Sequence, residues 1–516
     1  MRIHQSGDSS TPAFGRFAGL FLALFVVAAI PVLSCDSMPL FDYPNHLARM
    51  HILLDLPDSP TLQQFYEVAW RPLPNLAMDA IVPVLGRVMP LAWAGKVFVL
   101  LTLFLLAYGA AILHRVLFGA WSAWSCLAFL LLYSRTLLWG FLNYLFGLGL
   151  ALLALALWVA LARRPMALRL VAGVFLGLAL FFAHLLAFGL YGVMVMGYEA
   201  GRILRGRASI RQGLAEIVIA GLGFVPALGI LFLGSPASMS GAVRWGHLAR
   251  KIDLLFSVFD NYDRGFDVAC FVLVVLALLF VFWRGWVRLA PDIAVPLGLL
   301  AVVYLAMPSQ LATASGSDHR IPLLIGLVLI AGSRWVCPAA PRRSFLAAAL
   351  LMFLLRLAVV TASWTESDRI YAKLLPALDA IPVGSRVAVA YPAEALNSEA
   401  APLAHFPTLA ILRRDAFVPT LFAFPTQQPV LLRPAYRLLA DRLPPERLWA
   451  AFVAGDAPLD GEDRAAFAAY DDIVFVGRAP FSLAASPGLT PVFTAPRFAL
   501  FRIDPGARLD APGPSR

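Results

Sequence analysis

The sequence predicts a polytopic α-helical membrane protein with about eleven transmembrane helices and a small external α/β domain at its C-terminal end. Of its 516 residues, 60% are apolar and 14% are charged, and its mean hydropathy is +0.78. Soluble globular proteins contain about 45–50% apolar and about 25% charged residues. This composition excludes the soluble classes of enzyme.

Eleven apolar stretches are candidate membrane spans, because a transmembrane helix needs about 20 mostly apolar residues. They cover residues 17–34, 91–113, 120–133, 138–161, 168–184, 186–200, 213–233, 266–283, 290–307, 321–336 and 345–361. Residues 168–200 are alternatively one long tilted helix.

The basic residues indicate how the chain crosses the membrane. Its net charge of +10 comes from 41 Lys and Arg against 31 Asp and Glu, and in membrane proteins such an excess gathers in cytoplasmic loops. Nucleic acid is therefore not an expected partner. For the most part, basic residues occur in alternate connections between the spans, which places all of them on the cytoplasmic side. They are Arg2, Arg16, His114, Arg115, Arg163, Arg164, Arg169, Arg202, Arg205, Arg207, Arg211, Arg284, Arg288, Arg342 and Arg343. We predict a membrane protein with a cytoplasmic N-terminus and an external C-terminal domain.

The predicted organisation has three parts. Residues 1–361 form a transmembrane domain with an external loop at 35–90, residues 362–503 form the external α/β domain, and residues 504–516 form a disordered tail. In the external domain the residue patterns predict a helix at 367–380, strands at 386–391 and 472–477, and a hairpin at 490–503. Residues 32–35, Val-Leu-Ser-Cys, alternatively resemble a lipoprotein cleavage site, which leaves lipidation of Cys35 open.

The external loop carries a helical pattern with one polar face. In the stretch FDYPNHLARM, residues 41–50, Pro44 suits the first turn of a helix. If the helix continues to Leu54, four polar side chains share one face. They are Asp42, Asn45, His46 and Arg49. We predict a helix at the membrane surface that presents this face to a substrate, and the alternative is an ordinary solvated surface helix.

Two other segments contain candidate site residues. Asp79 and Arg87 would each cost about 2.5–3.5 kcal/mol at the bilayer centre, so the run that contains them is an interfacial or re-entrant helix. Asp79 either assists a site or interacts with the helix dipole.

Residues 317–322, Ser-Asp-His-Arg-Ile-Pro, precede a span at its outer end. There Arg320, beside His319, is suited to a lipid phosphate, or it snorkels to the headgroups. His184 is predicted to be a packed or interfacial histidine, and the eight histidines show no metal-ligand spacing.

These segments resemble the GT-C superfamily of membrane glycosyltransferases, which includes protein O-mannosyltransferases and lipid A aminoarabinose transferases. In that superfamily a first span precedes a large external loop with an acidic residue, and many further spans follow. Asp42 stands where the loop acid stands, and residues 74–76, 115–119 and 318–324 are similar to the short helix, the basic turn and the entry into a late span. The adjacent acidic pair of several GT-C families is missing, which leaves the donor and a divalent cation open. The strings FDYPNHLAR and NLAMD also resemble a group of bacterial membrane proteins for which no substrate is implied.

The resemblance implies a GT-C-like enzyme that moves a sugar from a polyprenyl-phosphate donor to an acceptor at the outer face of the membrane. Asp42 would be the general base, and Arg320 would stabilise the leaving phosphate. The other substrate-binding candidates are Asn45, His46, Arg49, Asp79 and His319. We also expect the C-terminal domain to cover the Asp42 loop and to share the outer side with Arg320. The expected partners are the lipid-linked sugar donor and membrane lipids.

The second hypothesis is a transporter or flippase for a lipid-linked sugar, or a non-catalytic membrane assembly protein. A transporter is expected to place ionisable groups along its route through the membrane. Away from their ends the predicted spans are nearly free of charge, and Lys96 and Arg356 are each close enough to an end to snorkel. This scarcity of charge favours the enzyme.

Overall fold

The computed structural model describes residues 11–234, 243–311, 314–393, 403–455, 457–481, 483 and 488–504. The predicted tail therefore lies outside the described residues, apart from Asp504. The chain forms two compact units. Unit 1 comprises Met1–Ser34, Pro72–Met78 and Lys96–Ser363, and unit 2 comprises Cys35–Arg71, Asp79–Gly95 and Trp364–Arg516.

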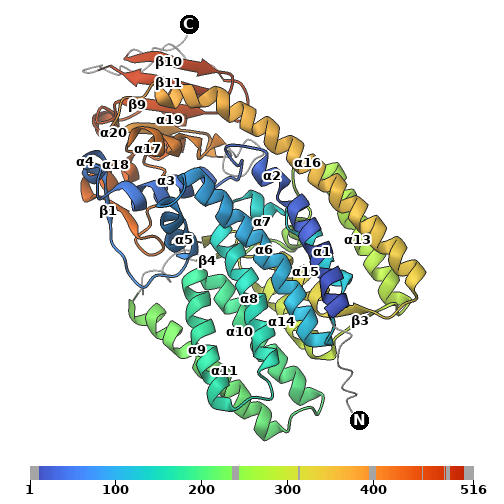
Figure 1. Ribbon diagram of the computed structural model, residues 1–516. Helices are drawn as coiled ribbons and strands as arrows, with labels where there is room; N and C mark the ends of the chain where they lie inside the picture. Colours follow the sequence, from blue (N-terminus) through green and yellow to red (C-terminus); the bar gives the residue numbers. More distant parts are fainter. Residues whose placement is uncertain are drawn as a thin grey trace. The chain divides into compact units, whose positions relative to one another are not determined.

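Unit 1 is built mainly from helices (Figure 1). They are α1 (Thr11–Ala28), α2 (Ile30–Leu33), α6 (Leu91–Phe118), α7 (Arg135–Leu138), α8 (Leu142–Ala160), α9 (Met166–Ala183), α10 (Leu185–Leu204), α11 (Ile210–Gly234), α12 (Leu248–Phe256), α13 (Arg264–Trp283), α14 (Pro291–Ala306), α15 (Ile321–Ala331) and the first part of α16 (Ala339–Asp379). Among the described helices, α6, α8, α9, α11, α13 and α16 are long and apolar enough to cross a membrane. The chain is a helical membrane protein, and the count of about eleven spans stays a prediction.

Two predicted spans are shorter than the sequence indicated. Residues 120–133 contain the 3₁₀ helix η1 (Ala123–Leu131), which at about 2.0 Å per residue is far shorter than a hydrocarbon core of about 30 Å. The helix predicted over 321–336 ends at Ala331. It stops there because β6 (Ser333–Trp335) pairs with β3 (Val287–Leu289) as an antiparallel ribbon.

Residues 168–200 form two helices, as the first of the two interpretations predicted. Helix α9 ends at Ala183 and α10 begins at Leu185. The residue between them, His184, has extended backbone angles that neither helix can include.

Glycines allow α9 and α11 to pack at close range. A Cβ atom on Gly177 would lie 2.9 Å from the carbonyl oxygen of Gly223, and one on Gly223 would lie 3.0 Å from the carbonyl carbon of Gly173. Gly173 and Gly177 are spaced so that they share one face of α9, and small residues at this spacing bring the backbones of membrane helices together. Helix α10 packs against α8, α11 and α14.

One ion pair is buried between α13 and α16. Nη1 of Arg356 lies 2.7 Å from Oδ1 of Asp267, and Nη2 donates to the carbonyl oxygen of Tyr133 at 3.2 Å. Only 5% and 4% of the two paired side chains are exposed. The prediction that Arg356 snorkels is therefore wrong, because Asp267 balances its charge inside the unit.

Helix α16 is continuous over 41 residues. It merges the predicted span at 345–361 with the helix predicted at 367–380, because no glycine or proline interrupts the chain between Pro341 and Pro376. The boundary between the two units lies within it, after Ser363.

Unit 2 contains a four-stranded mixed sheet in the order β10-β11-β9-β7 (Figure 1). Strands β7 (Val387–Ala390) and β9 (Asp472–Val476) are parallel, whereas β11 (Phe498–Ile503) is antiparallel to both β9 and β10 (Leu489–Ala495). Every residue of β7 and β9 is buried. The strands predicted at 386–391, 472–477 and 490–503 are confirmed.

The loop between the first two predicted spans contributes its own elements to unit 2. They are α3 (Tyr43–Asp55), α4 (Pro60–Phe65), β1 (Tyr66–Val68) and most of α5 (Ala77–Gly86). Strand β1 pairs with β8 (Val430–Leu432), and α3 packs against α17 (Leu409–Arg414). The predicted contact between the C-terminal region and the Asp42 loop is confirmed.

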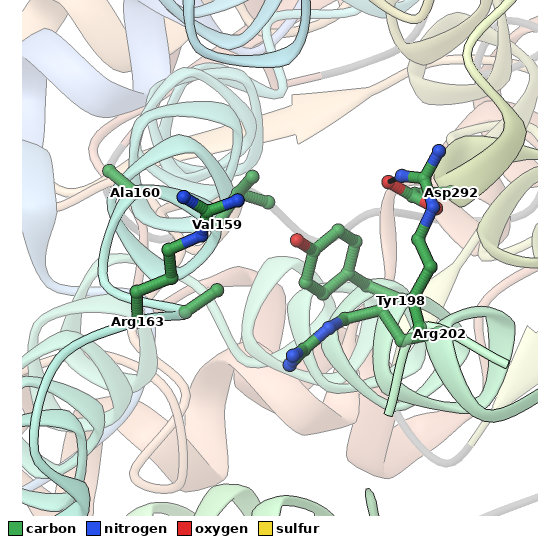
Figure 2. A pocket seen from close by; sticks show the side chains of 8 residues that line it. Val159, Ala160, Arg163, Tyr198, Arg202 and Asp292 are labelled. Carbon is green, nitrogen blue, oxygen red and sulfur yellow. Dashed lines mark hydrogen bonds and ion pairs between the residues drawn. The ribbon is translucent and has the colours of Figure 1, made fainter. Parts of the chain in front are cut away.

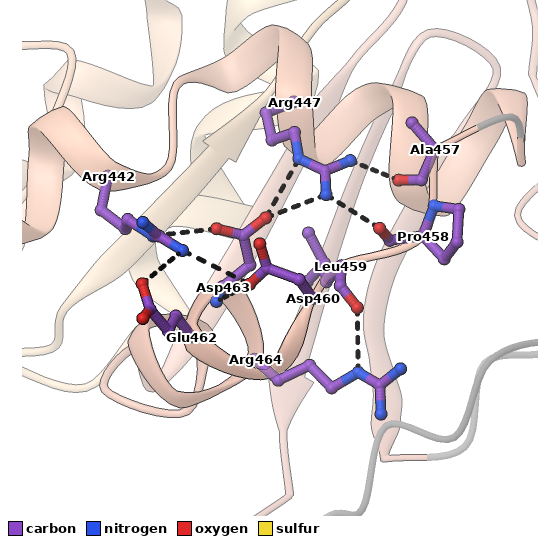
Figure 3. Close-up of polar contacts among 9 residues, drawn as sticks. All are labelled: Arg442, Arg447, Ala457, Pro458, Leu459, Asp460, Glu462, Asp463 and Arg464. Carbon is purple, nitrogen blue, oxygen red and sulfur yellow. Dashed lines mark hydrogen bonds and ion pairs between the residues drawn. The ribbon is translucent and has the colours of Figure 1, made fainter.

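An ion-pair network holds the segment that leads into α20 (Gly461–Phe467) (Figure 3). Arg442, at the end of α18 (Pro434–Arg442), lies within 3.3 Å of Asp460, Glu462 and Asp463. Arg447, in α19 (Pro445–Trp449), lies 2.9 Å from Asp463. Asp460 caps α20 by accepting the backbone N–H of Asp463 at 2.7 Å, so this network stabilises the fold of unit 2.

Candidate active site

Asp42 lies immediately before the first turn of α3. Pro44 occupies the helix start, where its fixed φ angle and missing N–H fit, and α3 begins at Tyr43. Although aspartate commonly caps helices, the Asp42 side chain makes no capping hydrogen bond. About one-eighth of this side chain is exposed, and its carboxylate lies near His405.

His405 approaches Asp42 from the C-terminal part of unit 2. Its Nε2 lies 3.6 Å from Oδ1 of Asp42. Its ring contacts those of Phe41 and Phe422, whose centroids lie 4.6 Å and 5.0 Å away. These aromatic contacts leave 5% of His405 exposed. The arrangement is a partly accessible carboxylate beside a buried imidazole.

Asn45 sets the orientation of the His405 ring. Oδ1 of Asn45 accepts the backbone N–H of Phe422 at 2.6 Å, and its Nδ2 donates to the carbonyl oxygen of Thr420 at 2.8 Å. These two bonds fix the amide so that Nδ2 lies 3.2 Å from Nδ1 of His405. A ring nitrogen that accepts from an amide carries no proton. The neutral ring therefore bears its proton on Nε2, which faces Asp42.

Burial keeps His405 neutral. The absence of water around the ring lowers its pKa from the ordinary 6.5 to about 4, because the imidazolium form loses its hydration. At neutral pH the group beside Asp42 is an uncharged N–H donor. Its Nε2 faces the Asp42 carboxylate at 3.6 Å.

The depressed pKa of His405 predicts a stability that decreases in acid. Between pH 6.5 and about 4 the unfolded chain binds a proton at this ring and the folded chain does not, so stability falls as the pH falls through this window. Acidification from about pH 7.5 to about pH 5 should cost roughly 2 kcal/mol at this site. The melting temperature of His405→Gln should therefore fall less between these pH values than that of the wild type. The exposed His247→Gln should follow the wild type, and equal acid sensitivity in all three proteins would contradict the assignment.

Arg49 and Asp79 form a buried bidentate ion pair. Nε of Arg49 lies 2.6 Å from Oδ1 of Asp79, and Nη2 lies 3.1 Å from Oδ2. The exposed fractions of the two side chains are 1% and 0%. The pair joins α3 to the first turn of α5. Nη1 of Arg49 is buried and has no hydrogen-bond partner among the described residues.

A second cluster forms in unit 1 where α15 begins. The guanidinium group of Arg320 lies 3.9 Å from the ring centroid of Phe141 and 5.8 Å from that of Tyr144. The Tyr144 hydroxyl donates to the Arg320 carbonyl oxygen at 2.6 Å, which fixes the backbone at this point. Stacking on the aromatic rings covers a face of the guanidinium group and directs its N–H donors sideways.

His184 adds another donor to this cluster. Its Nδ1 accepts the backbone N–H of Leu186 at 3.1 Å, so the neutral ring carries its proton on Nε2. This nitrogen lies 3.4 Å from Nη1 of Arg320. The imidazole and the guanidinium group therefore lie side by side at the start of α15.

Buried charges hold the segment that precedes Arg320. Asp318 is fully buried, and its carboxylate lies 3.0 Å from Nζ of Lys251 and 3.6 Å from Nη2 of Arg250. Lys251 belongs to α12, in the loop between residues 234 and 265. These contacts tie that loop to the start of α15.

His319 reports the electrostatic potential of this cluster. It is buried, with its ring edge-on to Trp139 at 5.5 Å between centroids. Burial first, and then the charges of Arg135, Arg320 and Arg250, lower the pKa of His319 to about 3. Among the described residues here, the cations Arg135, Arg250, Lys251 and Arg320 outnumber the carboxylates Asp260 and Asp318, so this positively charged region is suited to a phosphate.

The structure brings together five of the predicted site residues in unit 2 and two in unit 1. Unit 2 holds Asp42, Asn45, His46, Arg49 and Asp79, and unit 1 holds His319 and Arg320. His46 is half-buried, and its ring lies edge-on to Phe422 at 6.2 Å between centroids. The catalytic and substrate-binding roles of all seven remain predictions.

The polar face predicted for α3 is largely buried and does not face solvent. Asn45 and Arg49 are buried and bind other parts of unit 2, because the C-terminal region and α5 cover this side of the helix. Sequence analysis missed His405, for which no local pattern exists. Within the described ranges, no three His, Cys, Asp or Glu side chains are grouped so that they could hold a metal ion.

No protein-family model matches the chain, and no curated protein matches its sequence. Solved structures do match. The crystal structure of ArnT from Cupriavidus metallidurans bound to undecaprenyl phosphate is similar with a TM-score of 0.54 and 13% identity, over 96% of this chain and 99% of that chain. The apo structure of the same protein has a TM-score of 0.53 and 13% identity, over 95% and 98% of the two chains. The chain therefore has the fold of ArnT, the GT-C fold that the sequence resemblance predicted.

Proposed function

We propose that this protein is a membrane sugar transferase that takes a sugar from a polyprenyl-phosphate carrier and passes it to an acceptor at the outer face of the bacterial inner membrane. Its fold supports this proposal, because the ArnT structure with that fold contains undecaprenyl phosphate. The observation that carries the proposal is the partly exposed carboxylate of Asp42, held beside the oriented N–H of His405.

In the proposed reaction Asp42 removes the proton from an acceptor hydroxyl. The hydroxyl oxygen forms a bond to the anomeric carbon of the sugar as the bond from that carbon to the phosphate oxygen breaks. The polyprenyl phosphate leaves with the electron pair, and the proton stays on Asp42. His405 does not exchange protons in this scheme. Its Nε2–H faces the Asp42 carboxylate, so His405 is a positioning residue.

Arg320 is proposed to stabilise the phosphate that leaves. Phosphate oxygens accept directed hydrogen bonds from guanidinium groups, and these bonds strengthen as negative charge develops. The stacking on Phe141 fixes the orientation of the group before the donor binds. The N–H of His184, near Nη1 of Arg320, supplies a further donor.

The test of the function uses membrane vesicles that contain the full chain, and vesicles that lack it. Both receive undecaprenyl phosphate linked to a radiolabelled sugar. We expect release of undecaprenyl phosphate, together with labelled product that no longer carries the polyprenyl chain, only where the protein is present. Label that crosses the bilayer while still attached to the carrier would instead identify a transporter. If the labelled sugar neither leaves the carrier nor crosses the bilayer with it, both functions are contradicted.

Arg320→Gln should weaken the binding of undecaprenyl phosphate to the purified protein by about 10–100-fold, because a charge-assisted hydrogen bond contributes about 1.5–3 kcal/mol. Arg320→Lys should bind with intermediate affinity, since lysine keeps the charge and loses the planar fork. Titration monitored by native mass spectrometry measures these affinities.

Arg284→Gln is the matched control for this prediction. Arg284 also stacks on an aromatic ring, that of Trp286 at 5.2 Å, but it lies outside the Arg320 cluster. Its removal should leave the affinity for undecaprenyl phosphate unchanged. A loss of affinity of the same size in both variants would exclude Arg320 as the phosphate ligand.

A further inference from the structure

A second polar pocket lies in unit 1, at the end of α10 that is remote from His184. Its volume is about 480 Å³, and it is formed where α8 and α10 end and α14 begins. Figure 2 shows Arg163, Tyr198 and Arg202 directing their polar ends into this space, with Asp292 at one side. The described part of unit 1 thus contains a second collection of cationic groups besides the Arg320 cluster.

Helix α10 separates the two collections of charge. It begins after His184, which contacts Arg320, and continues for 20 residues. At 1.5 Å per residue it is about 30 Å long, which is the thickness of the hydrocarbon core of a bilayer. Helix α9 connects the same two ends, since it begins just after Arg163 and ends just before His184, and unlike α10 it is also apolar enough to cross a membrane. The pocket and the Arg320 cluster are therefore distinct sites at opposite ends of α9 and α10.

Arg202 is anchored so that part of its guanidinium group remains available. Its Nη1 lies 2.8 Å from Glu199 and also contacts Glu216. Both carboxylates bind Arg169 as well, which stacks on Trp158 at 4.3 Å. The hydrogen bonds of Arg202 all use Nη1, so Nε and Nη2 have no hydrogen-bond partner among the described residues.

Two further donors of the pocket are unpaired in the described structure. Arg163 is exposed and takes part in no ion pair or hydrogen bond there. Tyr198 is 5% exposed, and its hydroxyl has no hydrogen-bond partner in the same set of residues. A tyrosine that buries its ring normally satisfies its hydroxyl. The tyrosine and the two arginines therefore form an incomplete hydrogen-bonding site for an anion.

The charge of the pocket favours an anionic occupant. Arg163, Arg202 and Arg207 line it together with one carboxylate, Asp292, which pairs with Arg207. Glu199 and Glu216 balance Arg202 and Arg169 behind the lining, so the excess positive charge is that of Arg163. The remaining lining comes from the apolar end of α8. Basic pockets between membrane helices, at the level of the headgroups, bind anionic lipids.

We propose that this pocket binds the phosphate group of an anionic phospholipid in the leaflet opposite to the Arg320 cluster. The phosphate oxygens accept hydrogen bonds from Arg163, from Arg202 and from the Tyr198 hydroxyl. A soluble phosphate ester shares this chemistry, and the position of the pocket at the end of a membrane-length helix favours the lipid source.

The experiment titrates the purified full chain in detergent with phosphatidylglycerol and counts bound lipids by native mass spectrometry. Arg163→Gln and Tyr198→Phe should each weaken the tightest bound lipid by about tenfold or more, because each removes a donor to the phosphate. Arg164→Gln is the matched control, since Arg164 neighbours Arg163 in the sequence, is exposed and does not line the pocket. It should change the affinity by less than about twofold, because an exposed charge outside the pocket makes no direct contact with the phosphate.

Two probes, one soluble and anionic and the other a neutral lipid, identify the source of the phosphate. Glycerol phosphate carries the same anion without acyl chains and should not displace the lipid, and diacylglycerol lacks the phosphate and should not bind at the site. Equal losses in Arg163→Gln and Arg164→Gln would show general surface attraction and overturn the proposal. Displacement by glycerol phosphate would overturn the lipid source. Arg320→Gln should leave this lipid bound, and its loss in that variant would contradict two separate sites.

Discussion

Replacement of Asp42 by asparagine should lower the rate of sugar transfer by about 10²–10⁴-fold, the usual contribution of a general base. Asparagine has nearly the same shape as aspartate but accepts no proton from a hydroxyl. The side chain makes no capping bond to α3, so the substitution should preserve the helix. Release of undecaprenyl phosphate from a labelled donor, measured in membrane vesicles, follows the rate.

Asp58→Asn is the matched control for this experiment. Asp58 belongs to the same unit and the same loop, and it is exposed. It should retain wild-type turnover, whereas Asp42→Asn should lose activity without a change in melting temperature. Near-normal turnover in Asp42→Asn would remove this residue from the role of base and leave the proposed reaction without one.

Asp79→Asn should destabilise the protein by about 3–5 kcal/mol, because removal of one partner leaves the buried charge of Arg49 uncompensated. Both side chains are almost completely excluded from solvent. For a unit of this size, such a loss corresponds to a decrease of roughly 6–20 °C in melting temperature. Thermal unfolding of the purified protein in detergent measures it.

The double variant Arg49→Met with Asp79→Leu distinguishes a structural pair from a substrate site. Replacing both charges by apolar side chains of similar size is often neutral or stabilising, so this variant should recover most of the melting temperature. If Arg49 or Asp79 binds substrate, the double variant folds but loses transfer. A melting temperature of Asp79→Asn within about 2 °C of the wild type would contradict the buried pair.

The sequence predicted the elements whose signals are local. Strands β7 and β9 are short apolar runs bounded by polar residues, and this pattern depends only on neighbours in the chain. The start of α3 at Tyr43, with Pro44 in its first turn, was predictable for the same reason. Composition alone established a helical membrane protein, and the short motifs around Asp42 and Arg320 led to the fold that the ArnT structures share.

The partners of the candidate site residues depend on contacts between distant segments. His405 is separated by 360 positions from Asn45, which orients it, and nothing around it in the sequence marks it. In the sequence, Arg49 and Asp79 each fit the role of a residue that binds the substrate. Their pairing is visible only when α3 and α5 are folded together.

Span lengths were the least predictable property. An apolar run indicates that a segment is buried away from water. It does not distinguish an α-helix from the 3₁₀ helix found over Ala123–Leu131. It also does not reveal that Ser333–Trp335 leaves the helix to pair with another strand. These outcomes depend on packing within unit 1.

The buried pair of Asp267 and Arg356 has a consequence for the order of biosynthesis. Its two members are separated by 89 positions, and the ribosome adds about 5–20 residues per second. Arg356 is therefore synthesised roughly 4–18 s after Asp267, and α14 and α15 are made in that interval. During that interval a nascent chain carries an unmatched carboxyl group in α13. Premature termination before α16 should thus yield a product that membrane quality control recognises and degrades.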